Sequence, residues 1–167
     1  MKELYLAIKA QLLLKVPSIK FIAMWNNQLM DLTDGKNYSF RMPAVFIEFV
    51  SPTPIGSIGN NVQIYEPLEV KIHILHEQYD AKDGTMDCNL DVFTFKQSIY
   101  KALQLFQAAN TSVFDRQSEE QDYDHSNIYH YIQSYMIAMV DNDMPLPIDG
   151  TENEPPHTTE ITAEIDN

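Results

Sequence analysis

Residues 62–76 read Val-Gln-Ile-Tyr-Glu-Pro-Leu-Glu-Val-Lys-Ile-His-Ile-Leu-His, and this stretch decides the fold class. Apolar Val70, Ile72 and Ile74 recur at every second position, which is the period of a β-strand with one dry face. Pro67 cannot donate a backbone hydrogen bond, so we expect a break or bulge there. The face that we expect to be wet carries Glu69, Lys71 and His73.

Further strands are predicted on both sides of this stretch. Residues 42–50 are apolar on both faces except at Glu48, which is typical of a central strand covered on both sides. Residues 113–121 and 128–140 are expected to form an antiparallel hairpin, with the polar residues 116–127 as their connection. Two short strands are expected nearer the N-terminus. They span residues 19–25 and 28–32 and would form a second hairpin.

Two amphipathic helices are predicted from apolar residues at helical spacing. The first spans residues 2–16 and ends at Pro17, which cannot continue the hydrogen-bond ladder. The second spans about residues 88–107, with Asp87 as its N-cap. Its apolar stripe is expected to pack on the sheet. The stripe consists of Val92, Phe95, Ile99, Leu103 and Phe106.

These elements predict an α+β fold, with a mainly antiparallel sheet, strand hairpins and two helices packed on one face. Residues 1–141 are expected to form a single domain, because no linker or repeat interrupts them. Residues 51–61 are rich in Pro and Gly and are predicted to be a long loop. Residues 142–167 hold seven acidic residues and no Lys or Arg, and are predicted to be an acidic, Pro-containing tail or arm.

Composition and charge exclude several classes of function. The chain has 167 residues and a formal charge of −13, from 11 basic and 24 acidic residues. Such a chain repels phosphate backbones and anionic lipids, and its bases are scattered, so we expect neither sequence-specific nucleic-acid binding nor membrane association. Cys88 is the only cysteine, so no internal disulfide can form, and we expect an intracellular protein.

Catalytic and cofactor motifs are absent from the sequence. Neither a glycine-rich phosphate loop nor a GxSxG nucleophile motif occurs, so no catalytic residue and no cofactor are predicted. Cys88 is interpreted as a small side chain rather than a nucleophile. Residues 115–124 hold many carboxylates, and we interpret this segment as a solvated loop.

The best metal-like cluster consists of His73, His76, Glu77, Asp80, Asp83 and Asp87. On a strand the two histidines point to opposite faces, so they cannot chelate one ion without a bulge. We therefore predict no metal site.

The remaining signals concern surfaces. Ile55 and Ile58 are apolar residues on the predicted loop, and Tyr129, Tyr131 and Tyr135 share one parity of the last strand. We expect these five side chains to contribute to an interaction surface, as in an assembly subunit whose leftover apolar surface is covered by copies or neighbours.

The layout of residues 2–141 resembles the tail-terminator and head–tail joining (neck) proteins of tailed bacteriophages. The resemblance rests on order and size. It consists of a helix at residues 4–16, a strand entering through Met42-Pro-Ala-Val-Phe-Ile-Glu-Phe49, a loop at 51–61, a return strand at 62–76, a helix at 90–106 and a closing strand at 128–141.

This resemblance implies a non-enzymatic structural protein of a phage or prophage virion. Family members form rings, commonly hexamers, that join the tail tube to the neck. It therefore implies a homo-oligomer with other tail or neck proteins as partners, located in the virion after assembly in the bacterial host cytoplasm.

Two other functions remain open from the residues alone. The chain could be a small intracellular ligand-binding or regulatory domain, which would need an apolar pocket with convergent polar groups. It could also be a metal-dependent hydrolase that uses the region from His73 to Asp87, which would need stoichiometric metal.

Overall fold

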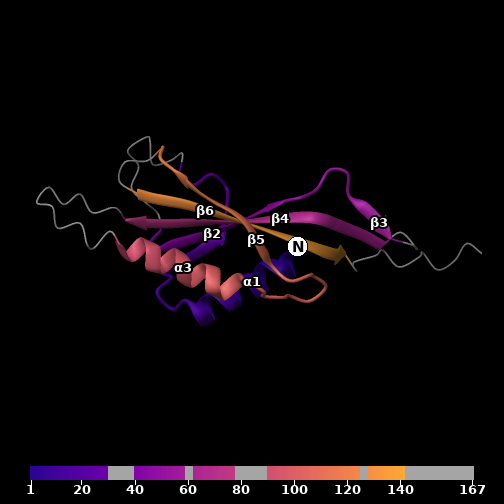
Figure 1. The fold of residues 1–167 in the computed structure, drawn as a ribbon, viewed down its shortest axis with the longest axis horizontal. Helices are drawn as coiled ribbons and strands as arrows, with labels where there is room; N and C mark the ends of the chain where they lie inside the picture. Colours follow the sequence, from indigo (N-terminus) through magenta and orange to yellow (C-terminus); the bar gives the residue numbers. More distant parts are fainter. Residues whose placement is uncertain (30–39, 59–61, 78–89, 125–127, 142–167) are drawn as a thin grey trace, which may run out of the picture.

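The computed structural model describes residues 1–29, 40–58, 62–77, 90–124 and 128–141. Within them the chain forms the predicted α+β fold, with two helices and a six-stranded, mostly antiparallel sheet (Figure 1). The elements are α1 (Lys2–Lys15), β1 (Phe21–Met24), β2 (Ala44–Val50), β3 (Gly56–Ile58), β4 (Val62–Glu77), α3 (Asp91–Leu103), β5 (Asp115–Asp122) and β6 (Ile128–Asp141).

The sheet has the strand order β1-β2-β4-β6-β5, with β3 paired to β4. β1 runs parallel to β2, and all other pairs are antiparallel. The expected N-terminal hairpin is therefore wrong in the described residues, since Gln28 and Leu29 form a turn rather than a strand. Asn27, with a φ of 55°, redirects the chain, and Leu29 is buried against the sheet instead of pairing.

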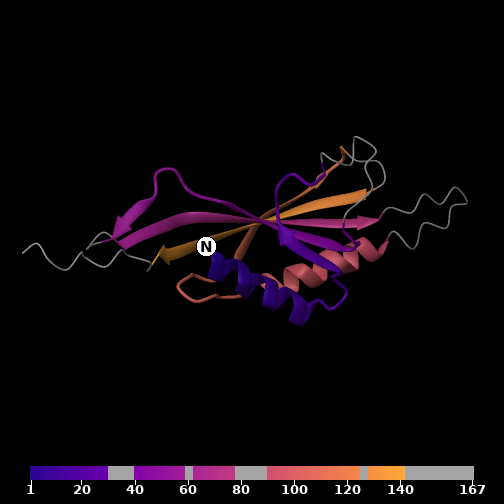
Figure 2. The same cartoon turned by 180° about the vertical axis from the view of Figure 1, so that it is seen from behind.

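Both helices pack on one face of the sheet, as predicted (Figures 1 and 2). This face holds the larger core, in which the alternating Val70, Ile72 and Ile74 of β4 are fully buried. The opposite face carries a smaller core beside the segment that follows β1. Its buried members are Leu29, Met42, Ala44, Phe46, Leu75 and Ile128.

The second helix is shorter than predicted and ends at Leu103 rather than near residue 107. Gln104 leaves the helical conformation with a ψ of 127°, and Leu105 follows in the left-handed region with a φ of 62°, so the helix ends before them. The chain then turns, and the Leu105 and Phe114 amides donate to the Phe114 and Phe106 carbonyls. Residues 78–89, including Asp87 and Cys88, lie outside the described residues.

β4 and β3 form an arm at one end of the molecule, beyond the helix layer (Figures 1 and 2). The register of β4 against β6 shifts between Tyr65 and Leu68, which places the predicted bulge at Pro67. The predicted loop is wrong at residues 56–58, which form β3. Gly56 suits this pairing, because a Cβ there would lie 2.8 Å from Ile64 Cγ2.

Candidate functional site

Helix α1 exposes an apolar stripe on the side that faces away from the core. Leu6, Leu13 and Leu14 are 50%, 47% and 75% exposed. They gather on one side of the helix because a residue seven positions on lies about 20° away around the axis, and one eight positions on about 80° away. A helix that is apolar on opposite sides is normally covered on both. The side that is already covered carries Leu4, Ile8 and Leu12.

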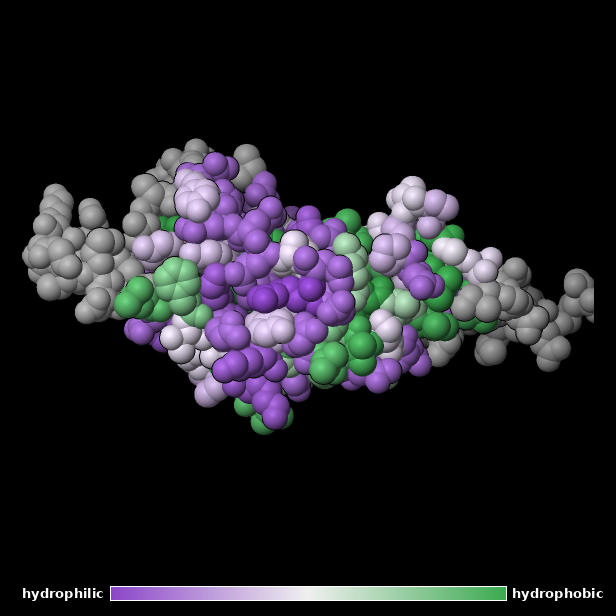
Figure 3. All heavy atoms as spheres, viewed as in Figure 1, coloured by the Kyte–Doolittle hydropathy of each residue, from purple (hydrophilic) through white to green (hydrophobic). Residues whose placement is uncertain are grey.

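Other exposed apolar side chains lie in separate places. Leu90 and Phe93 flank the start of α3, and Leu105 and Val113 lie on the turn after it. Figure 3 shows hydrophobic side chains of this kind around a polar central area. Ile55, one of the predicted interaction residues, is 44% exposed beside the arm. Ile58 lies in β3.

The three predicted interface tyrosines lie on the helix-covered face of β6, as their shared parity requires. Tyr131 and Tyr135 are 6% and 0% exposed, so these two belong to the core, which corrects their predicted surface role. Burial raises the pKa of the Tyr135 hydroxyl, which donates a hydrogen bond to Gln133 Oε1 at 2.8 Å. Tyr129 is half-buried and packs against the edge of the same core.

Strand β5 covers most of residues 115–124, which confirms the predicted strand at residues 113–121 and its antiparallel pairing, and corrects the interpretation of residues 115–124 as a loop. Glu119 on this strand accepts hydrogen bonds from Lys96 of α3, from Arg116 Nη1 at 3.1 Å and from Gln133 Nε2 at 2.8 Å. Burial alone would raise the pKa of Glu119, but the hydrogen bonds from Lys96 and Gln133 and the charges of Lys96 and Arg116 lower it overall. The carboxylate therefore ties β5 to α3 and β6.

Replacing Glu119 by glutamine removes the negative charge from its hydrogen bonds and is expected to lower the free energy of unfolding by about 1 kcal/mol at pH 7. The loss is no larger because solvent weakens charge interactions at a partly exposed site. Because the pKa is lower in the folded state, this stability is present above the ordinary glutamate pKa and is lost as the pH falls through the folded value. Urea unfolding at pH 7 and pH 3 measures the difference. Glu120→Gln, an exposed neighbour, is the control, and an equal loss in both variants would contradict the role of Glu119.

A polar network, which the sequence analysis did not predict, crosses the sheet face opposite the helices. Glu48, His73, His130 and Asp122 come from β2, β4, β6 and β5, which are consecutive neighbours in the sheet. His73 Nε2 lies 3.0 Å from Glu48 Oε2, and His73 Nδ1 lies 3.0 Å from His130 Nε2. His130 Nδ1 lies 3.0 Å from Asp122 Oδ2. We call these four residues the histidine-pair network.

The centre of the network is buried while its two ends reach water. The His73 and His130 side chains are 5% and 2% exposed, whereas those of Glu48 and Asp122 are 32% and 30% exposed. Trp25 covers the pair, since its ring stacks on His73 at 3.9 Å between centroids and 6° between planes. The predicted wet face of β4 is therefore wrong at His73, because partners distant in sequence cover and bind the side chain.

No metal centre forms among the residues that the structure describes. His73 faces Trp25, while His76 lies on the other side of β4 near Phe95, so the two histidines point to opposite faces as predicted. In the described part of the chain no three His, Cys, Asp or Glu side chains converge as metal ligands would. Asp80, Asp83 and Asp87 fall outside that part. None of the described helices is long and apolar enough to cross a membrane.

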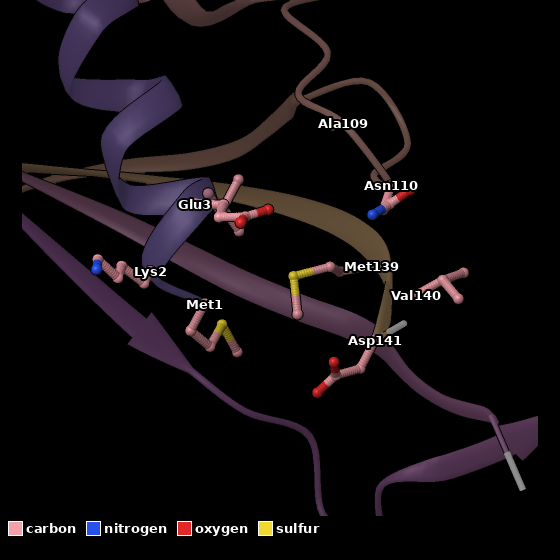
Figure 4. A pocket seen from close by; sticks show the side chains of 9 residues that line it. Met1, Lys2, Glu3, Ala109, Asn110, Met139, Val140 and Asp141 are labelled. Atoms are coloured by element: carbon pink, nitrogen blue, oxygen red, sulfur yellow. The ribbon is translucent and has the colours of Figure 1, made fainter. Parts of the chain in front are cut away.

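A pocket lies where the start of α1 meets the end of β6 (Figure 4). Its volume is about 180 Å³, and Lys2, Glu3, Asn110, Met139 and Asp141 are among the residues that line it. Sites for small organic ligands usually occupy 300–1,000 Å³ and are mainly apolar. This pocket is too small and too polar to favour the ligand-binding function.

A scan against protein-family models finds no match to this chain, and a comparison with curated protein sequences finds none either.

Proposed function

We propose that this chain is a non-enzymatic structural subunit of a phage or prophage virion, which forms a ring or connector at the head–tail or tail-terminator position. The observation that carries the proposal is the exposed apolar stripe of α1, formed by Leu6, Leu13 and Leu14. Three large apolar side chains on one exposed helix face are typical of a surface that another chain covers. The resemblance of the predicted layout to tail-terminator and neck proteins supports the virion context.

A ring is favoured over a two-fold dimer because the candidate surfaces are different in kind and lie apart. The stripe runs along α1 below the sheet, whereas the arm with Ile55 and β3 extends from one end of the molecule (Figures 1 and 2). Two different patches that bind each other make a head-to-tail contact, and such contacts close into a ring when the rotation permits. We expect the number of subunits to be six, as in the family it resembles.

The charge of the chain fits a place around a DNA passage. A formal charge of −13 repels the DNA backbone, so DNA would pass through a ring of such subunits without binding. The partners proposed for the two ring faces are tail and neck proteins.

Electron microscopy of the concentrated protein tests the proposal. The expected result is closed rings of one size. Particles of the size of one 19.2 kDa chain at every concentration, or open filaments, would contradict it.

A further inference from the structure

The three contacts of the histidine-pair network determine how many protons its two imidazoles must hold. Its three contacts, each 3.0 Å long, join four ring nitrogens and two carboxylate oxygens in one line. Each contact needs one bridging proton, because two lone pairs at this distance repel each other. Two neutral imidazoles carry only two N–H groups between them. All three hydrogen bonds can form only when the network holds a third proton.

We infer that the histidine-pair network is a proton-binding site, in which His73 and His130 together hold one extra proton that links the stability of the sheet to pH. The extra proton belongs to the imidazoles rather than the carboxylates, since imidazole is the stronger base. With Glu48 and Asp122 ionised, the network then carries a formal charge of −1. This inference does not depend on the proposed assembly.

The surroundings of the pair decide which imidazole is charged. Burial lowers the pKa of His73 to about 4, although the hydrogen bond with Glu48 opposes this effect and the charge of His130 adds to it. Neutral His73 donates from Nε2 to Glu48 and accepts at Nδ1. His130 must then donate from both of its nitrogens, to His73 and to Asp122, and is the imidazolium.

The other groups that face the pair are consistent with one positive charge. On β4, Lys71 lies on the same face and opposes a second charge on His73. On β5, Glu120 lies opposite Ile132, next to the network on that face, and its side chain is exposed. The segment after β1 contributes the indole ring of Trp25, whose face attracts a cation, with its centroid 5.7 Å from that of His130.

This proton number predicts a stability that is greatest near the ordinary histidine pKa of about 6.5. Above that pH the unfolded chain has lost the protons of both residues while the folded pair keeps one, so stability falls as the pH rises. Below it the unfolded chain gains two protons while the folded pair keeps one down to about pH 4, so stability falls as the pH falls. Two independent neutral histidines would give only the second of these limbs.

Urea unfolding between pH 5 and pH 9, at one protein concentration and followed by the emission of Trp25, tests the inference. Trp25 is the chain's one tryptophan and lies against the network. Between pH 7.5 and pH 8.5 the equilibrium constant for unfolding of the wild type is expected to rise relative to that of His130→Gln. The rise is up to about tenfold, because the wild type releases one proton when it unfolds. The matched control is His76→Gln, on the other face of β4, which should keep the wild-type profile. If the equilibrium constant for unfolding depended on pH equally in the wild type and in His130→Gln, the inference would be overturned.

Nitrogen NMR of the wild-type side chains gives a second readout that needs no variant to fold. At pH 7.5 we expect one buried histidine with both ring nitrogens protonated and a coupled partner protonated at Nε2 alone. Two buried neutral imidazoles at that pH would overturn the inference.

Discussion

Replacing Tyr135 by alanine is expected to lower the free energy of unfolding by about 3–5 kcal/mol, which is the range for removing a large aromatic side chain from a core. Tyr135 is 0% exposed and its ring lies 5.9 Å from that of Phe114 in the core beneath the helices. The substitution also removes the hydroxyl donor to Gln133, which leaves a buried acceptor without that bond. The loss is a large part of the 5–15 kcal/mol that stabilises an ordinary domain.

The control for this prediction is Tyr123→Ala, which removes the same side chain from a position that is 79% exposed. It should change the free energy of unfolding by less than about 0.5 kcal/mol. Tyr135→Phe keeps the ring and should cost only about 1 kcal/mol, for the hydrogen bond. If Tyr135→Ala left the free energy of unfolding unchanged but caused an oligomer to dissociate, Tyr135 would be an interface residue and its place in the core would be wrong.

The triple substitution Leu6→Gln, Leu13→Gln and Leu14→Gln is expected to weaken self-association about 100-fold or more. Each leucine is roughly half to three-quarters exposed, so covering it in an assembly adds about 1 kcal/mol of apolar burial. Three such contributions amount to about two orders of magnitude in the dissociation constant. The dissociation constant can be measured by sedimentation equilibrium.

Leu105→Gln is the matched control for the α1 stripe, because Leu105 is 71% exposed but lies on the turn after α3. It should associate like the wild type. The triple variant should retain the secondary structure of the wild type, since none of the three leucines is buried within the chain. Unchanged association of a folded triple variant would remove α1 from the interface.

Local patterns in the sequence were sufficient to predict the main elements. The alternation of Val70, Ile72 and Ile74 identified β4 and the face on which the helices pack. The end of α3 could not be predicted from the pattern, because apolar Phe106 continues the helical period while the non-helical backbone of Gln104 and Leu105 leaves no trace in it.

The histidine-pair network could not be predicted because each member comes from a different strand. His73 and His130 lie 57 positions apart, and only the strand order places them side by side. Taken alone, His73 continues a polar alternation and looks solvated. The role of Tyr131 and Tyr135 was within reach, since their shared parity could have been matched to the helix-covered face once β4 and β6 were paired.

The central claim is that this chain associates with copies of itself into a closed ring, and the mass in solution tests it most directly. Light scattering on a size-exclusion column, over a concentration series, should give one discrete oligomer, or a monomer that passes to that oligomer on concentration. The mass of a single 19.2 kDa chain at every concentration would contradict self-assembly.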